Sequence, residues 1–164
     1  GVDKVQGGGG QDTVEGNSGD DVLDGGADAD TISGNADNDN IQGGSGTDLI
    51  GGGSGNDVIA GGTESDTITG DSSYAADGTR TMDASGDDMI MGNAGADSIE
   101  GEGGNDGISG DGDNDGISGG DGNDSISGGD GVDNIQGDGG QDTIEGNAGD
   151  DVLDGGAEDR KSGV

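Results

Sequence analysis

The stretches GGSGNDVIA (52–60) and GGDGNDSIS (119–127) share one nine-residue pattern, G-G-x-G-x-D-x-U-x, in which U is an aliphatic residue. Fifteen complete units of this pattern keep one register, starting at residues 7, 16, 25, 34, 43, 52 and 61, and again at 83, 92, 101, 110, 119, 128, 137 and 146. The twelve isoleucines all stand at position 8, and the register extends to Val5, Val14, Leu23 and Leu153. A strict short period of this kind is the signature of a repeat architecture.

An aspartate occupies position 6, two residues before each of these sixteen aliphatic residues. The sixteen are Asp3, Asp12, Asp21, Asp30, Asp39, Asp48, Asp57, Asp66, Asp88, Asp97, Asp106, Asp115, Asp124, Asp133, Asp142 and Asp151. Aspartates of alternate units are 18 residues apart, giving six pairs before a break in the register and six after it. Because calcium takes six to eight oxygen ligands from carboxylates and main-chain carbonyls, the pattern predicts calcium ions held between such pairs.

The composition excludes several classes of protein. The 164 residues include 45 Gly and 38 Asp or Glu against four Lys or Arg, and the net charge is −34. With no Cys or His there is no disulfide framework, zinc cluster or Ser-His-Asp triad. The charge repels phosphate groups, so we expect no nucleic-acid binding, and no apolar run approaches the ~18 residues needed for membrane insertion. Low hydrophobicity with high charge also marks disorder, but a disordered linker has no reason to keep a nine-residue register.

The period also predicts the fold. In the x-U-x triplet, the central side chain points one way and its neighbours the other, as in a short strand. The six residues before it are rich in Gly and Asn, which accept left-handed backbone angles, and so form a turn. Two units then make one turn of 18 residues. We expect an all-β solenoid, a β-roll, with two short-stranded parallel sheets whose position-8 residues face each other as the only core.

Such a roll needs a cation. Sixteen aliphatic side chains form a thin core for a chain this rich in glycine, the costliest residue to order, and stacked carboxylates repel one another. Calcium between the turns removes both difficulties. About twelve ions or more are expected, and twelve would bring +24 against −34, leaving −10. Extracellular modules bind calcium at about 10⁻⁴–10⁻³ M, so we expect the chain to be unfolded inside the cell and folded outside.

The repeat resembles that of the hemolysin-type calcium-binding, or repeats-in-toxin (RTX), family. The resemblance implies a right-handed parallel β-roll with calcium between turns, type I secretion, and an extracellular, secreted or cell-surface location. It also implies main-chain carbonyl ligands from positions 1 to 4 of the turn. Carried over to this chain, these ligands are Gly44, Gly46, Gly53, Gly55, Gly120, Gly122, Gly129 and Gly131.

The break in the register divides the chain. The sequence predicts repeats over 1–69, an irregular insertion at 70–82, repeats over 83–157, and a terminal cap or junction at 158–164. The insertion has two interpretations, a docking loop or a bulged turn whose Tyr74 covers an exposed sheet edge. Residues 1–27 match 131–157 at 22 of 27 positions with an offset of 130. If the copies stack alike, 70–82 should contain an irregular half-turn of about nine residues plus roughly four extra.

We therefore expect a non-enzymatic, calcium-folded structural segment of a secreted bacterial protein, such as an adhesin, a surface or filament protein, or a toxin repeat region. One alternative is the C-terminal repeat region of a secreted metalloprotease, lipase or polysaccharide-modifying enzyme. A minor one is an ice-binding solenoid, but position 7 is Thr in only four of sixteen cases. Expected partners are calcium and, at the open sheet ends, a second copy or further repeats.

Overall fold

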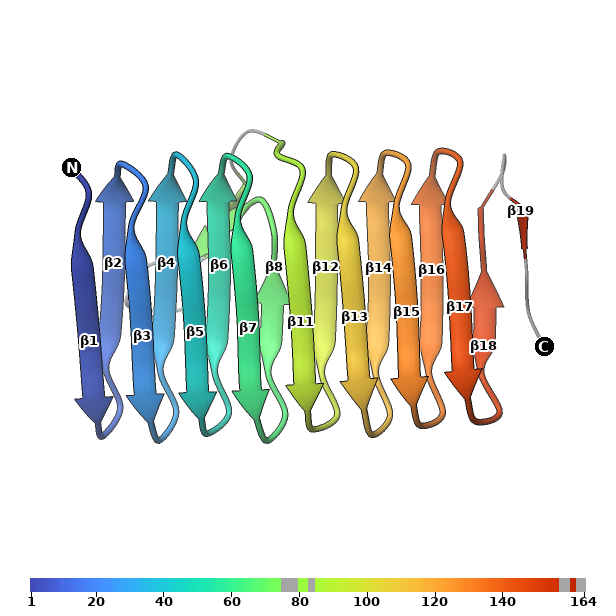
Figure 1. Cartoon of the computed structure of the whole chain (residues 1–164), viewed down its shortest axis with the longest axis horizontal. Helices are drawn as coiled ribbons and strands as arrows, with labels where there is room; N and C mark the ends of the chain where they lie inside the picture. Colours follow the sequence, from blue (N-terminus) through green and yellow to red (C-terminus); the bar gives the residue numbers. More distant parts are fainter. Residues whose placement is uncertain (75–79, 83–84, 157–159, 162–164) are drawn as a thin grey trace.

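The computed structural model describes residues 1–74, 80–82, 85–156 and 160–161, which form strands and turns and no helix. Two parallel sheets lie face to face and form a solenoid, as the repeat predicts (Figure 1). Sheet A contains, in spatial order, β1 (Lys4–Gly9), β3 (Val22–Ala27), β5 (Asn40–Ser45), β7 (Val58–Thr63), β11 (Met89–Ala94), β13 (Gly107–Gly112), β15 (Ser125–Asp130), β17 (Thr143–Ala148) and β19 (Arg160–Lys161). Sheet B contains β2 (Thr13–Ser18), β4 (Thr31–Ala36), β6 (Leu49–Ser54), β8 (Thr67–Thr69), β12 (Ser98–Gly103), β14 (Gly116–Asp121), β16 (Asn134–Gly139) and β18 (Val152–Asp154).

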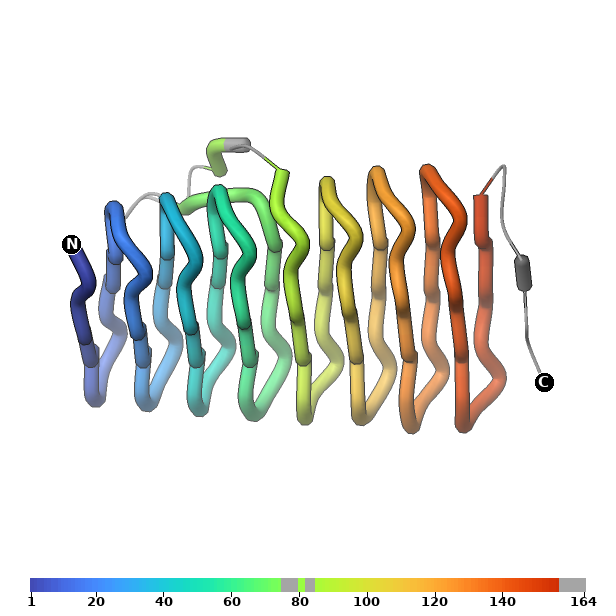
Figure 2. The backbone as a smooth tube through the Cα atoms, turned by 45° about the horizontal axis from the view of Figure 1, so that its top comes forward, coloured from blue at the N-terminus to red at the C-terminus, as the bar shows by residue number. Residues whose placement is uncertain are grey.

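The register between neighbouring strands is the one that the 18-residue spacing predicts. Ile32 in β4 lies opposite Ile50 in β6, and Ile108 in β13 lies opposite Ile126 in β15. Consecutive units alternate between the two sheets, so the chain winds along one axis, with its turns along the two long edges (Figure 2). Every aspartate at position 6 therefore lies directly beside its counterpart in the next turn on the same edge.

The core is the row of position-8 side chains between the sheets. The chain buries all twelve isoleucines with Val14 and Leu23, and each of these side chains is at most 3% exposed. Val5 and Leu153, in the outermost turns, are partly buried against this cluster. The predicted core is confirmed.

The strands are longer than the predicted triplets. In β4, Thr31–Ala36 covers positions 7 to 9 of one unit and continues through positions 1 to 3 of the next. The continuation is possible because position 2 adopts a positive φ (79° at Asn35) yet still pairs with Gly53 of β6. Position 4 then turns the chain, again with a positive φ, 125° at Gly46. The compact turn is therefore shorter than six residues.

The predicted half-turn within the insertion is wrong. Ile59 lies directly opposite Ile90, and Ile68 directly opposite Ile99, so no strand of either sheet stands between them. As a result, the duplicated segments lie on opposite sheets, since β2 belongs to sheet B and its copy β17 to sheet A. The two faces of the roll are similar enough for one sequence to fit either.

The insertion begins two residues later than the break in the register suggested. Gly70 takes position 1 of the interrupted unit, because a Cβ there would meet the Asp88 carboxylate and the Gly101 carbonyl, the contacts that other position-1 glycines make. Gly86 stacks between Gly55 and Gly104 at position 4. Joining 70–71 to 85–91 gives GDSGDDMIM, a complete nonapeptide. The thirteen extra residues are therefore 72–84.

Part of the insertion folds back over the roll. Strand β9 (Ser72–Tyr74) pairs antiparallel with β10 (Arg80–Met82) (Figure 2). Tyr74 is 7% exposed, lies over Gly51, and donates its main-chain N–H to Ser33 Oγ at 3.3 Å. The expectation that it covers a sheet edge is wrong, because it covers the outer face of sheet B, where Ser33 and Gly51 leave room.

Two predicted segments lie partly outside the described residues. Residues 75–79 and 83–84 of the insertion are among them. Of the predicted terminal cap at 158–164, only Arg160–Lys161 is described, and this pair forms β19, which adds to β17 in sheet A. Within the described part of the chain, no helix has the length and apolarity to cross a membrane.

Candidate metal centre

The position-6 aspartates form two columns, here called the aspartate ladders, one along each long edge of the roll. One ladder leads into sheet A and contains Asp3, Asp21, Asp39, Asp57, Asp88, Asp106, Asp124 and Asp142. The other leads into sheet B and contains Asp12, Asp30, Asp48, Asp66, Asp97, Asp115, Asp133 and Asp151. The structure thus brings every predicted carboxylate ligand onto one of two edges.

Each ladder is held together by its own carboxylates. The main-chain N–H of an aspartate donates to the Oδ1 atom of the aspartate in the next turn, at 2.6–3.1 Å. The bond from Asp30 to Asp48 Oδ1 is 2.8 Å and that from Asp106 to Asp124 Oδ1 is 2.9 Å. One oxygen of each inner carboxylate is therefore used to fix the spacing of the turns.

The second carboxylate oxygen has no such partner. The ladder aspartates between the end turns are 1–4% exposed, and their Oδ2 atoms are buried with no hydrogen-bond donor. These atoms belong to Asp21, Asp30, Asp39, Asp48, Asp57, Asp66, Asp88, Asp97, Asp106, Asp115, Asp124 and Asp133, and the half-buried Asp12 at one end of its ladder also has a buried Oδ2 atom without a donor. A buried carboxylate oxygen without a donor or a cation is costly, so the pattern indicates a missing positive partner.

The glycines at position 1 make the space around these oxygens. A Cβ on Gly16 would lie 2.7 Å from Asp21 Oδ2 and 2.8 Å from the Gly34 carbonyl oxygen of the next turn. A Cβ on Gly25 would lie 2.6 Å from Asp30 Oδ2 and 2.7 Å from the Gly43 carbonyl oxygen. A carboxylate oxygen and a main-chain oxygen thus converge on one small cradle in successive turns. Hard oxygen donors of this kind suit calcium, so the residues fit the predicted ion.

The carbonyl ligands implied by the family resemblance lie at positions 2 and 4 of the turns. Gly44, Gly46, Gly53, Gly55, Gly120, Gly122, Gly129 and Gly131 all have positive φ, between 107° and 156°. Their geometry points oxygen atoms along the edge, with the Gly44 carbonyl against Gly62 and the Gly131 carbonyl against Gly149. The turns place these oxygens between neighbouring rungs, and their role as ligands stays a prediction.

Burial and mutual repulsion raise the pKa values of the ladder carboxyls. The pKa of Asp88 rises to about 8, chiefly because burial disfavours its charged form and then because Asp57 and other carboxylates lie near. The pKa of Asp57 and of Asp66 rises to about 7 for the same reasons. The main-chain N–H bond to each carboxylate lowers the pKa, but by less than burial raises it. A cation between the rungs would offset this accumulated negative charge.

Among the described residues, no three acidic side chains converge closely enough to hold a metal ion by themselves. An ion between rungs would therefore take a pair of carboxylates together with main-chain oxygens. Sequence reasoning missed two such pairs, Asp57 with Asp88 and Asp66 with Asp97, because they are 31 residues apart. The nonapeptide frame restored by removing 72–84 is the signal that could have identified them.

A row of mixed Asp, Asn and Gln side chains at position 5 runs beside one of the aspartate ladders. At position 5, the main-chain N–H of Asn56 donates to Asn38 Oδ1 at 2.8 Å, and that of Asn123 donates to Asn105 Oδ1 at 3.0 Å. The row consists of Asp20, Asn38, Asn56, Asp87, Asn105, Asn123 and Gln141. These exposed side chains link successive turns on the edge leading into sheet A, so this edge has hydrogen bonds between turns that involve no buried carboxylate.

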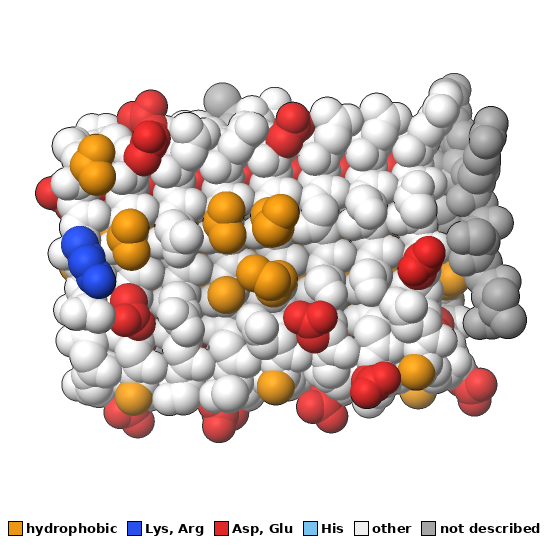
Figure 3. All heavy atoms as spheres, viewed as in Figure 1, with side chains coloured by type: hydrophobic (Ala, Val, Ile, Leu, Met, Phe, Trp, Pro, Cys, Tyr) orange, Lys and Arg blue, Asp and Glu red, His pale blue; other side chains and the backbone are white. Residues whose placement is uncertain are grey.

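The described outer surface of sheet A has no row in which one type of polar side chain repeats. Its position-7 row mixes Val22, Asn40, Val58 and Met89 with Gly107. Val58 and Met89 are neighbours and partly exposed, and hydrophobic side chains gather over β7 and β11 on the face shown in Figure 3. The repeated chemistry of the roll therefore lies along its edges.

Comparison with known proteins agrees with this geometry. The profile of the RTX calcium-binding nonapeptide repeat matches residues 1–32, 15–50, 24–59, 51–73, 84–117, 109–144 and 127–159. Residues 74–83, which lie within the insertion, fall between the matched segments. No curated protein matches the chain. The repeats of this family bind calcium, and the chain, matched over most of its length, belongs to the RTX calcium-binding nonapeptide repeat family.

Proposed function

We propose that this chain is a non-catalytic structural segment of a secreted bacterial protein, and that calcium drives its folding outside the cell. An adhesin, a surface or filament protein, or the repeat region of a toxin would use it as a spacer. The observation that carries the proposal is the row of buried Oδ2 atoms without donors along both edges. Without cations these atoms raise the free energy of the folded state, and bound cations would lower it.

The location follows from calcium affinity. Extracellular calcium modules bind at about 10⁻⁴–10⁻³ M, above the calcium level of a cytosol. A chain that needs many such ions stays unfolded before export and folds afterwards. Binding to the folded state alone stabilises it by mass action, and a dozen weak sites acting together can produce a steep transition. The unfolded chain is also the form that a narrow export channel accepts.

A structural rather than enzymatic role is supported by the uniformity of the carboxylates. In the described residues, the acidic pairs of the ladders recur at one repeat position, and each is surrounded by the same glycines. A catalytic pair needs two carboxyls with different environments, so that one is protonated while the other is charged. Repetition of one environment suits many equivalent metal sites.

Far-UV circular dichroism of the whole chain tests the proposal. The spectrum should change from a disordered chain to β structure on adding about 5 mM calcium, a concentration above the affinity of extracellular modules. Magnesium at the same concentration serves as the control, because it demands a strict octahedral geometry and keeps its water, and should leave the chain unfolded. Identical spectra with and without calcium would overturn the proposal.

A further inference from the structure

The insertion opens a cavity in the outer layer of sheet B. Strand β8 ends at Thr69, so the pairing between β8 and β12 stops at Glu100. The Asp71 carboxylate takes over two main-chain donors at this gap, Gly103 N–H at 2.8 Å and Gly86 N–H at 2.7 Å. Beside it lies a cavity of about 340 Å³.

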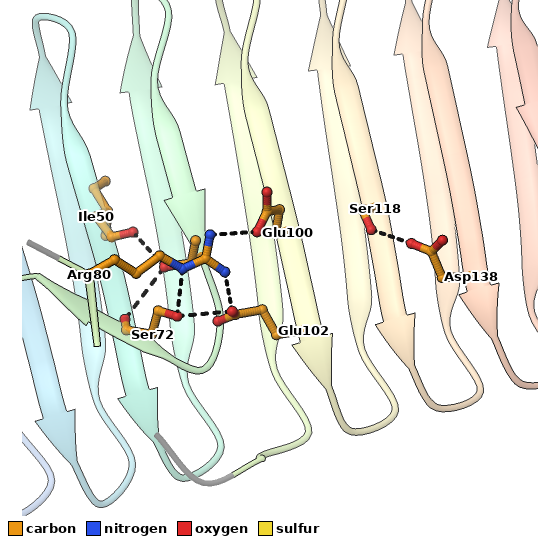
Figure 4. Close-up of polar contacts among 8 residues, drawn as sticks. Ile50, Ser72, Arg80, Glu100, Glu102, Ser118 and Asp138 are labelled. Atoms are coloured by element: carbon orange, nitrogen blue, oxygen red, sulfur yellow. Dashed lines mark hydrogen bonds and ion pairs between the residues drawn. The ribbon is translucent and has the colours of Figure 1, made fainter. Parts of the chain in front are cut away.

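The β9–β10 hairpin closes one side of this cavity. Arg80 Nη1 lies 2.8 Å from Glu100 Oε2, and Arg80 Nη2 forms an ion pair with Glu102 Oε1 (Figure 4). Arg80 Nε donates to Ser72 Oγ at 2.9 Å, and Ser72 Oγ donates to Glu102 Oε1 at 2.9 Å. Glu102 Oε1 thus has two partners from the hairpin.

The other oxygen of Glu102 has none. Its side chain is 7% exposed and lines the cavity, and its Oε2 atom is buried without a hydrogen-bond donor. The lining includes the carboxylates of Asp71, Glu100, Glu102 and Asp121 against one cation, Arg80, which leaves three negative charges (4 − 1 = 3). The buried oxygen thus belongs to a residue that lines a cavity of net negative charge, and a cation beside it would offset both the missing donor and that charge.

We propose that this cavity binds a calcium ion through Glu102 Oε2, with Asp121, Ser85 and water as the other oxygen donors available in the lining. The site differs from the ladder sites, because Glu102 stands at position 2 of its unit, whereas ladder ligands stand at position 6. The ion would fix the hairpin to the second half of the roll. This site goes beyond the proposed function, which needs only the ladders.

Native mass spectrometry of the whole chain in calcium counts the bound ions. Glu102→Gln keeps the shape of the side chain and should bind one ion fewer than the wild type. The matched control is Glu100→Gln, which also removes one charge and one Arg80 contact but no buried oxygen, and should keep the wild-type count. Arg80→Gln breaks the ion pairs with both Glu100 and Glu102 but leaves every carboxylate in place, so it should also keep the wild-type count. Equal counts for Glu102→Gln and wild type would overturn the proposal.

A crystal of the wild-type chain grown with calcium decides the question without any variant. An anomalous difference peak between Glu102 and Asp121 is expected in addition to peaks along the ladders. Ladder peaks with only water in the cavity would reject this site and leave the proposed function intact. A chain that folds without any calcium would reject the proposed function, whatever the cavity holds.

Discussion

The main-chain N–H of Asp57 donates to Oδ1 of Asp88 at 2.7 Å, although the two residues are 31 positions apart and an insertion separates them. The same bond, at 2.8 Å, joins Asp39 to Asp57 at the ordinary spacing of 18. The ladder therefore crosses the insertion without a gap, and the two halves of the chain form one continuous column of sites.

Asp88→Asn should raise the calcium concentration needed for folding. Asp88 lies between Asp57 and Asp106, so its substitution weakens two sites, each contributing about 1.4 kcal/mol when free calcium is ten times the Kd. Asp87→Asn is the matched control, because Asp87 is exposed and occupies a row that already contains Asn56 and Asn105. Calcium titrations followed by circular dichroism should shift for the first variant alone. Equal shifts would mean that only net charge matters.

Gly110→Ala should destabilise the calcium-bound roll. Its Cβ would press on the Asp115 carboxylate and lie 2.6 Å from the Gly128 carbonyl oxygen, at a φ that alanine accepts. Overpacking of this kind costs about 1–3 kcal/mol. Gly112→Ala is the control, because its Cβ would meet nothing closer than 3.6 Å. Thermal unfolding in calcium should distinguish the two, and similar melting temperatures would refute the proposed cradle.

Lowering the pH should stabilise the folded roll in the absence of calcium. The pKa values of Asp57 and Asp66 are raised to about 7 and that of Asp88 to about 8, above the ordinary 3.8 that they regain on unfolding. The folded state binds more protons in this range, so this part of its stability is fully present below pH ~4 and is lost as pH rises through 7 to 8. Calcium needs the deprotonated form, so acid should weaken its binding.

Circular dichroism of the calcium-free chain measures this effect. More β structure is expected at pH 5 than at pH 8.5, and the calcium midpoint should lie higher at pH 5. A calcium-free chain that gains structure as the pH rises would show that the ladder carboxyls are charged and satisfied without metal.

Deleting residues 72–84 should leave a roll that still folds with calcium. The deletion joins Asp71 to Ser85 and restores the unit GDSGDDMIM. Asp71 would then occupy position 2, where Asp111 and Asp138 already adopt positive φ. Loss of the buried Tyr74 side chain should cost about 1.5–3 kcal/mol.

The control for this deletion removes only residues 72–83. It leaves a unit of ten residues, which moves later side chains to the wrong face of the sheet. Calcium-dependent circular dichroism should show a cooperative transition for the first deletion and a weakened one for the second. A sharper transition for the 72–83 deletion than for the 72–84 deletion would show that the extra residues are not 72–84.

Much of the fold was predictable because one physical requirement repeats. A buried aliphatic residue every nine positions determines which side chains face inward, and an aspartate two residues earlier determines which carboxylates stack, as Ile32 with Asp30 shows. The strand length was not predictable from the triplet, because positions 1 to 3 keep pairing even with a positive φ at position 2.

The position of the insertion over sheet B could not be predicted, because it depends on packing that the nonapeptide pattern does not specify. Tyr74 lies over Gly51 and Ser33 because these outward positions carry small side chains, whereas Glu15 and Glu100 occupy the same position in other units. The buried oxygen of Glu102 is likewise a consequence of where β8 ends. Sequence periodicity predicts the ladder sites, and only the tertiary arrangement indicates the cavity.

Small-angle X-ray scattering with and without calcium tests the central claim most directly, because it measures the size of the whole chain. A compact chain of 164 residues has a radius of gyration of about 15 Å, and an unfolded one of about 43 Å. We predict the larger value in chelator and a value near the smaller one in millimolar calcium. A compact particle in chelator, unchanged by calcium, would contradict the account.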